Sequence, residues 1–297
     1  TWWKGKNMAE QKMTDEQLSQ ELHKSKGSRT GGKLLSLFGG IVIVSGIILG
    51  GNMALIIVGG VLLGLGQMTR GKAQDNANQQ VYNAIVPDIV GNIFENVQID
   101  PVPHLLDVKD TNIPLPSHSY CSGGGYIRGT YHGLTAELCT VKLTDVNEFQ
   151  REETGLWEKN EREIYTGQWM LCELGQEFSA WLTIWPRDKM DRLFNTKTIK
   201  TGNEAFDKRF NLSSDDAEKA LGILSSSRME RFLELAVSAG GKLAINLNRD
   251  GKLYMAVHSG CVFFDTGNGH ESPMQLRQRF TDELRLFTDL IDLFRSM

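Results

Sequence analysis

The sequence predicts an α+β protein, with an N-terminal transmembrane helical hairpin followed by a domain of antiparallel β-hairpins, packed helices and a closing C-terminal helix. Three observations predict it. An uncharged apolar run covers residues 34–68, and runs of this kind enter bilayers. Alternating apolar residues recur beside turn residues between positions 126 and 257. Apolar residues then step by three or four along positions 274–294, which is typical of an amphipathic helix.

Four segments follow from this pattern. We expect a cytosolic basic N-terminal segment at 1–33, the transmembrane hairpin at 34–68, an amphipathic helix with a proline-containing linker at 69–116, and a cytosolic α+β domain at 117–297.

Composition excludes several classes of protein. The 297 residues carry 32 basic and 36 acidic side chains, for a net charge of −4, and this near-balance argues against a nucleic-acid partner. The four cysteines at 121, 139, 172 and 261 are too few and too widely spaced for a disulfide scaffold or a zinc site. We interpret them as reduced thiols.

The apolar run needs to turn back on itself. As one helix it would be roughly 52 Å long, whereas a hydrocarbon core is about 30 Å thick. Gly50, Gly51 and Asn52 stand at its midpoint and favour a turn. Each arm of about 17 residues is at the short limit for a span, so a re-entrant loop remains the alternative to a two-span hairpin.

Small residues are spaced for close packing in these arms. Gly46 and Gly50 are four residues apart, as are Gly60 and Gly64, and this spacing lets helix backbones approach closely in lipid. We expect the two arms to pack on each other, because their short connection removes most of the entropy cost of association. A homo-oligomer built through the same glycines is the alternative.

Charge predicts the orientation of the hairpin. Residues 1–33 carry seven basic and four acidic side chains, the turn carries none, and Arg70 and Lys72 follow the second arm. The positive-inside rule therefore places both ends in the cytoplasm. Reduced cysteines fit that compartment.

A helix and a linker are expected between the membrane and the domain. Val81, Ile85, Ile89 and Ile93 step by four and form one apolar helical face, which Pro87 is expected to kink or split. Four prolines between positions 99 and 116 predict an extended linker, so we expect the folded domain to start close to Ser117.

Three β-hairpins are predicted in the domain from β-forming residues on either side of turn residues. The strand pairs are 126–131 with 134–143 around His132 and Gly133, 164–172 with 178–185 around Gly175, and 243–247 with 253–257 around Asp250 and Gly251.

Helices complete the domain. Two are predicted at 215–224 and 227–238, the second with a capping box formed by Ser227 and Glu230. The helix at 274–294 should lie across the sheet and close the domain. The charged stretch 147–163 is predicted to be a solvated helix or loop, with a partner surface as the alternative.

One stretch of the domain resembles a known family. Residues 201–210 contain Phe206, Asp207 and Phe210 in an F-D-x-x-F pattern, and a helix with Met229, Glu230 and Arg231 follows. This arrangement resembles bacterial membrane proteins that carry the domain of unknown function numbered 3137, as do the strand Tyr165-Thr166-Gly167 and the apolar hairpin. The resemblance implies a membrane-anchored cytosolic domain at the inner face of a bacterial membrane. It implies no reaction.

We expect the family-like residues to be structural. Phe206 and Phe210, four apart, can bury on one face, and Asp207 can cap the local backbone. A lone carboxylate needs a partner group for acid–base work, so we favour this interpretation over a catalytic Asp207.

No other motif predicts chemistry. The glycine-rich run 121–126 lacks the spacings of phosphate-binding loops and leads into a strand. The six histidines show no HxH or HxxxH pair, and Cys121 with His118 lies in a loop, so we predict no metal, no cofactor and no thiol nucleophile. The aromatic set favours sheet core over a ligand groove: Tyr165, Trp169, Trp181 and Trp185.

The sequence thus favours a binding or adaptor module over an enzyme. Its expected partners are the lipid bilayer and a protein or small ligand, with an open sheet edge or the aromatic hairpin as the binding surface. A membrane-tethered hydrolase or transferase, using Asp207, His132 or other groups gathered by the fold, is the runner-up. A hairpin that acts as an oligomerising element is the third hypothesis.

Overall fold

The computed structural model describes residues 16, 20, 37, 41–42, 57–58, 83–100, 104–108, 111–151, 156–187, 197–266 and 271–295. The chain forms two compact units. The smaller one comprises Thr1–Ile89 and Phe264–Arg279, and the larger one, here named the sheet unit, comprises Val90–Phe263 and Phe280–Met297.

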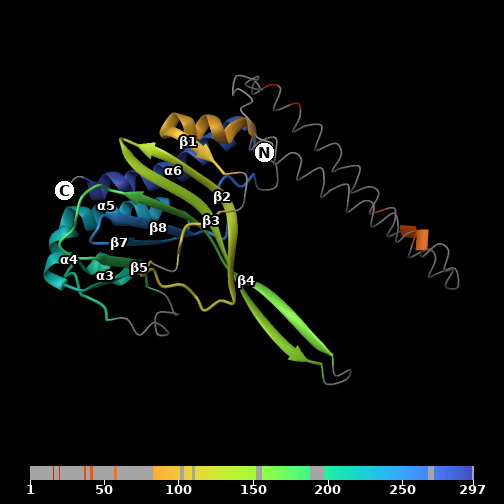
Figure 1. The fold of residues 1–297 in the computed structure, drawn as a ribbon, viewed down its shortest axis with the longest axis horizontal. Coiled ribbons are helices and arrows are strands. Elements are labelled where there is room, and N and C mark those ends of the chain that lie inside the picture. The colour runs from red at the N-terminus through yellow and green to blue at the C-terminus, as the bar shows by residue number, and fades with distance from the viewer. Residues whose placement is uncertain are drawn as a thin grey trace, which may run out of the picture. The chain divides into compact units, whose positions relative to one another are not determined.

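The sheet unit contains one antiparallel sheet of eight strands (Figure 1). Their order across the sheet is β1-β2-β3-β4-β8-β7-β5-β6, and together with the helices it confirms the predicted α+β class. The strands are β1 Glu95–Ile99, β2 Tyr120–Tyr131, β3 Leu134–Gln150, β4 Trp157–Glu173, β5 Leu182–Pro186, β6 Phe210–Ser214, β7 Lys242–Leu247 and β8 Lys252–His258.

The helices of the domain mostly follow the sequence pattern. They are α3 Glu204–Arg209, α4 Ala217–Ile223, α5 Ser226–Ser238 and α6 Pro273–Arg295. Residues 83–93 are also helical without a break at Pro87, so the helix does not split there. In α5 the predicted capping box is wrong, because Ser225 is the N-cap and makes no side-chain cap bond.

Both faces of the central part of the sheet are covered. On one face the Gln168 amide donates to Glu283 of α6 at 3.2 Å. On the other face a covering segment of irregular structure, described at residues 104–108 and 111–116, lays Leu106, Val108 and Ile113 against the sheet, each at most 6% exposed. This second cover explains why every residue of Leu243–Leu247 is buried, including those between the alternating apolar positions.

The segment expected to be a linker is therefore part of the folded unit. β1 pairs with β2, through Ile99 opposite Ile127, and Leu106, Val108 and Ile113 belong to the hydrophobic core. The folded unit begins before the boundary expected near Ser117, because leucine, valine and isoleucine between the prolines find an apolar sheet face to cover.

Two of the three predicted hairpins are confirmed. β2 and β3 are joined by His132 and Gly133, whose φ angles of 48° and 83° suit the type of turn that matches strand twist. β7 and β8 pair as expected, with Ile245 opposite Met255 and a turn at Gly251.

The second hairpin is wrong. β4 pairs with β3 over its whole length and with β8, whereas β5 pairs with β6 and β7. The segment between β4 and β5 instead docks on the β7–β8 turn, where the Phe178 amide donates to the Arg249 carbonyl at 2.8 Å. Burial on both faces of the sheet thus decided the pairing, and β4 does not pair with β5, the next strand along the chain.

The prediction that the charged stretch 147–163 is a helix or loop is also wrong for most of its described residues, which are in strands. These residues form the far ends of β3 and β4, which pair from Asp145 opposite Arg162 to Gln150 opposite Trp157. Opposite charges meet on this ladder, as in the 3.0 Å ion pair between Arg151 and Glu158, so the charge pattern is compatible with paired strands.

The predictions on the apolar run lie almost entirely outside the described residues, and those on Gly46, Gly50, Gly60 and Gly64 lie wholly outside them. Within the run the structure describes Leu37, Ile41, Val42, Ile57 and Val58, all helical, and four of these side chains are more than half exposed. In the described part of the chain, no helix has the length and apolar character needed to cross a membrane.

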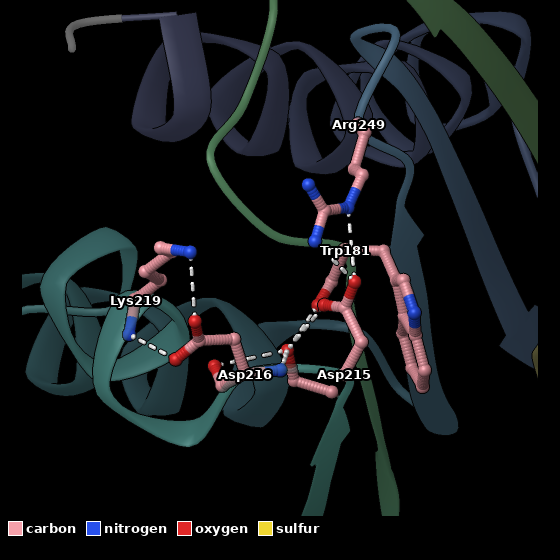
Figure 2. A network of polar contacts seen from close by, with 6 residues as sticks. Trp181, Asp215, Asp216, Lys219 and Arg249 are labelled. Carbon is pink, nitrogen blue, oxygen red and sulfur yellow. Dashed lines mark hydrogen bonds and ion pairs between the residues drawn. The ribbon is translucent and has the colours of Figure 1, made fainter.

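A polar network ties the β7–β8 turn to the start of α4 (Figure 2). Arg249 donates from Nε and a terminal nitrogen to one oxygen of Asp215, at 2.9 and 2.5 Å. Asp216 caps α4 by accepting from the Lys219 amide at 3.2 Å. Although burial acts to raise it, the hydrogen bonds and charge of Arg249 hold the pKa of Asp215 below its ordinary value.

This pair predicts a pH-dependent stability. Replacing Arg249 by Gln should lower the free energy of unfolding by about 0.5–1 kcal/mol near neutral pH. A carboxylate with a lowered folded pKa stabilises the fold above its unfolded pKa of about 3.9 and loses that effect as the pH falls through the folded value. Urea unfolding near pH 7 and near pH 3 should therefore show the difference between wild type and Arg249→Gln shrinking in acid.

Lys208→Gln is the control, because its pair with Glu204 is more than two-thirds exposed on both sides. It should have little effect at either pH. A deficit of Arg249→Gln that is equal at both pH values would contradict the prediction.

Candidate functional site

A cavity of about 610 Å³ opens in the sheet unit, on the face that residues 104–108 and 111–116 cover. It lies where β8 ends and β7 begins, beside β4 and the end of β5. Its lining comes from residues 113–117, from Asp145 of β3, Arg162–Tyr165 of β4, Trp185 and Pro186 of β5, Lys242 and Ala244 of β7, and Ala256 and His258 of β8.

Two small residues leave the space open. Ala244 and Ala256 are directly opposite each other on β7 and β8, and both line the cavity between the larger side chains of Tyr165 and Trp185. Cross-strand neighbours stand about 5 Å apart, so two methyl groups leave a hollow that larger residues would fill. Ile113 and Leu115 of the covering segment line the same space.

Tyr165 forms one wall through a contact along its own strand. Tyr165, Gly167 and Trp169 lie on one face of β4, and the Trp169 indole donates to the Tyr165 hydroxyl at 2.9 Å. The tyrosine ring lies over Gly167, where an added Cβ would be 2.7 Å from two ring carbons and closer still to the hydroxyl. Glycine at 167 thus lets the ring lie flat along the strand.

His258 completes this wall. Its imidazole stacks on the Tyr165 ring with centroids 4.5 Å apart and an interplanar angle of 28°. Burial raises the pKa of Tyr165 well above its ordinary value, so the phenol stays protonated at neutral pH and acts as a packing and hydrogen-bonding group.

The rim of the cavity is charged. Arg162, Lys242 and His258 supply groups that are or can become cationic, and Asp145 and Glu163 supply carboxylates. Glu163 already has partners, because it accepts a hydrogen bond from the Thr166 hydroxyl and lies 3.4 Å from the Lys142 ammonium. The hydrogen bond from Thr166 and, to a smaller extent, the charge of Lys142 lower the pKa of Glu163. Among the described residues nothing forms an ion pair with Arg162.

The family-like motif is elsewhere and has a packing role. Phe206, Phe210 and Phe232 of α5 form a buried triangle with ring centroids 5.1–6.0 Å apart. One Asp207 oxygen accepts from both the backbone amide and the hydroxyl of Thr201, each at 3.1 Å. None of these residues lines the cavity.

The helix that carries the second half of the motif is also structural. Met229 is buried at 4% exposure, while Arg231 pairs with Glu234 at 2.9 Å and with Asp289 of α6 at 3.3 Å. Glu230 is exposed. These contacts fix α5 against α6 and form no site.

The remaining sequence candidates do not converge on the cavity. The glycine-rich run is part of β2, where Gly123 has φ 148° and a Cβ there would collide with the Thr140 carbonyl. His132 lies in the β2–β3 turn. All four thiols are free, and burial raises the pKa of Cys139 to about 11, so that thiol is not a nucleophile at neutral pH. In the part of the chain that the structure describes, no cluster of three metal-ligating side chains occurs.

Sequence reasoning identified two walls of the cavity but not the cavity. The prediction of sheet core is confirmed for three of the four aromatic residues, Tyr165, Trp169 and Trp185, which belong to the hydrophobic core. Trp181 does not belong to that core. Tyr165 and Trp185 also line the cavity. Ala244, Ala256 and Arg162 were missed. The available signal was the pair of alanines at matching positions of a strongly apolar hairpin, since small residues at a core position leave room.

Comparison with known proteins supports the family resemblance. Residues 163–295 match the family described as Protein of unknown function (DUF3137), which is the family predicted from the sequence. No curated protein matches the chain. The crystal structure of the mycobacterial trehalose monomycolate transport factor A, TtfA, is similar at 12% identity over 59% of this chain and 73% of that chain, with a TM-score of 0.32.

The contact between Tyr165 and Gly167 predicts an unusual effect of a small substitution. Gly167→Ala should lower the free energy of unfolding by about 1–3 kcal/mol, because the added methyl group must displace a buried ring. Urea unfolding measures the loss, and near-ultraviolet circular dichroism should report the changed surroundings of Trp169.

Gly222→Ala in α4 is the matched control. A Cβ at that position meets nothing within 4 Å, and alanine favours a helix over glycine by up to about 1 kcal/mol. The control should therefore gain stability. If Gly167→Ala were as stable as the wild type, the ring would not be held as described.

Proposed function

We propose that this chain, whose residues 163–295 match the DUF3137 family, is a membrane-anchored binding module at the inner face of a bacterial membrane. The proposed ligand is amphipathic, with an apolar part and an anionic group, and the cavity beside Tyr165 holds it. The observation that carries the proposal is a cavity with an apolar floor and a rim that includes Arg162.

The size and lining of the cavity support this proposal. Small-molecule sites measure about 300–1,000 Å³, are largely apolar and carry a few polar groups that orient the ligand. This one has Ile113, Trp185 and Ala256 among its apolar lining residues and five charged or ionisable residues at its rim. The rigid sheet on which it is built favours a preformed site.

The anionic preference follows from the balance of rim charges. No ion pair with a described residue engages the Arg162 guanidinium, whereas the Glu163 carboxylate is already engaged by Thr166 and Lys142. A ligand carboxylate can accept two parallel hydrogen bonds from the Arg162 guanidinium, a geometry that a cation cannot use.

Membrane anchoring is supported by the sequence. The apolar run 34–68 is uncharged and is bordered by basic residues on both sides. Apolar side chains at the described positions of this run, such as Leu37 at 64% and Ile57 at 60% exposure, would be covered by lipid.

The enzyme hypothesis has less support. An acid–base site needs two or more groups in reach of one substrate atom. Asp207 is occupied by Thr201, and neither Asp207 nor His132 lines the cavity. Tyr165 lines the cavity, but burial raises its pKa, so it is protonated at neutral pH and does not supply a phenolate nucleophile.

Ligand binding can be tested with a defined amphipathic anion. Indole-3-acetate has an aromatic part and a carboxylate, so it should give a saturation-transfer NMR signal with the full chain in lipid nanodiscs. Tryptamine, with an ammonium group instead, should bind at least fivefold more weakly. Ala256→Leu should abolish the signal, because three added carbons fill the hollow.

Ala217→Leu is the matched control, since the same bulk is added at an exposed position of α4. It should bind like the wild type. Equal signals from all three proteins, or a preference for tryptamine, would refute the proposed site.

Anchoring can be tested by flotation with vesicles. The full chain should float with lipid and resist carbonate extraction. A double variant, Ile43→Asp with Ile57→Asp, should be extracted, because aspartate in the centre of a membrane helix costs about 2.5–3.5 kcal/mol each. Leucine at the same positions is the control, and extraction of the wild type would refute anchoring.

A further inference from the structure

Among the described residues, no strand occupies one side of the far half of β4. β4 pairs with β3 along its whole length, but it pairs with β8 only from Gln168 to Glu173. Beyond that, the Gly260 amide donates to the Thr166 carbonyl at 3.1 Å, and the chain then crosses toward the other face of the sheet, where the Phe263 amide donates to Thr140. Figure 1 shows the ends of β3 and β4 projecting past the other strands.

The hydrogen-bond pattern shows which backbone groups point to that side. The Arg151 amide donates to the Leu156 carbonyl at 2.9 Å, and bonded pairs alternate along an antiparallel ladder. The backbone N–H and C=O groups that point away from β3 are therefore those of every second residue of this half of β4: Trp157, Lys159, Glu161 and Glu163.

The opposite side of the hairpin confirms this alternation. Ser119 donates its amide to the Thr144 carbonyl at 2.9 Å, and its hydroxyl accepts from the Val146 amide at 3.0 Å. Thr144 and Val146 are opposite Glu163 and Glu161. Since these β3 groups point outward, their β4 partners also point outward, on the side where the described residues place no strand.

The open edge ends at the cavity. Residues 157–163 span roughly 23 Å at about 3.3 Å per residue, and Arg162 and Glu163 at their inner end line the cavity together with His258, the last residue of β8. A chain that paired with this edge would continue the line of β8 and would pass directly over the apolar floor.

The projecting hairpin also carries exposed apolar side chains. Phe149 is 47% exposed, Leu156 67% and Trp157 71%. Large apolar residues gathered on one exposed element mark interaction surfaces in soluble domains. Among the described residues, several neighbouring charges are paired within the hairpin, as in Lys159 with Glu161 at 3.0 Å. Arg162 is the cationic group at the inner end of the edge, with Asp145 opposite it on β3.

We infer that the ligand of the cavity is an extended segment of a partner protein, which adds to β4 as a ninth strand over residues 157–163. Its backbone pairs with the outward groups of Lys159 and Glu161, an apolar side chain enters the cavity, and an acidic side chain meets Arg162. This inference rests on the proposed cavity function and specifies the class of ligand. Strand addition of this kind takes affinity from the backbone and specificity from the pocket.

The test uses a fluorescein-labelled peptide in which threonine and valine alternate, with one tryptophan and a neighbouring glutamate. Binding to the full chain in nanodiscs is measured by fluorescence polarisation. Glu161→Pro should weaken binding tenfold or more, because proline removes one outward N–H without breaking the β3 pairing. Glu161→Thr, which keeps that N–H and loses the same carboxylate, should bind like the wild type.

A second measurement does not depend on how the proline variant folds. The same peptide, N-methylated at alternate residues on the side that would face β4, should bind the wild type at least tenfold more weakly than the unmodified peptide. Methylation on the other side should leave binding unchanged, because those amides face solvent.

The outcomes separate the two proposals. If Ala256→Leu abolishes peptide and indole-3-acetate binding while Glu161→Pro and N-methylation have no effect, strand addition is refuted and the cavity function stands. If the wild type binds neither the peptide nor indole-3-acetate, both strand addition and the cavity function are refuted. Concentration-dependent dimerisation of the wild type that Glu161→Pro removes would assign the edge to a second copy of this chain and overturn the assignment to a partner protein.

Discussion

The burial of one sheet on both faces is the constraint from which the other features follow. Helices α5 and α6 cover one face through contacts such as Gln168 with Glu283, and the covering segment covers the other with Leu106, Val108 and Ile113. Because the central strands β7 and β8 are buried on both sides, they read as nearly continuous apolar runs. A sheet of this kind has no solvent-facing side to hold a site, so a hollow has to come from small residues within the core.

That hollow is the feature on which the proposed function depends. Opposed alanines at 244 and 256 leave space that the covering segment does not fill. Tyr165 borders the space because Gly167 allows its ring to lie along the strand, where Trp169 holds the hydroxyl and His258 stacks on the ring. The strand Tyr165-Thr166-Gly167, which contributed to the family resemblance, therefore has a physical reason for its glycine.

The motif that carried most of the resemblance has a different role. Phe206 and Phe210 pack with Phe232 of α5, and Asp207 holds the backbone of Thr201. These contacts attach α3 and α5 to the edge of the sheet at β6. The match of residues 163–295 to DUF3137 supports the family resemblance. The F-D-x-x-F residues are structural, while apart from Tyr165 the cavity is built from residues outside the family-like motifs.

The sequence by itself determined the local elements and the chemical character of the chain. Alternation and turn residues specified the β2–β3 and β7–β8 hairpins, because a hairpin needs only neighbouring residues and a suitable turn. Periodicity specified α6 and the burial of Phe206 and Phe210. The apolar run 34–68 determined the expectation of a membrane hairpin, since its length and lack of charge are properties of the sequence alone.

Only the tertiary structure decided how distant segments combine. Contacts between residues far apart in sequence determine the pairing of β4 with β3 and β8 and the position of β5 between β6 and β7. They also determine the packing of Leu106, Val108 and Ile113 on the sheet. The cavity and the open edge of β4 exist because β8 ends at His258 while β4 continues to Trp157. The cavity and the open edge depend on the relative lengths of β4 and β8, which become neighbours only on folding. The local sequence pattern therefore does not predict them.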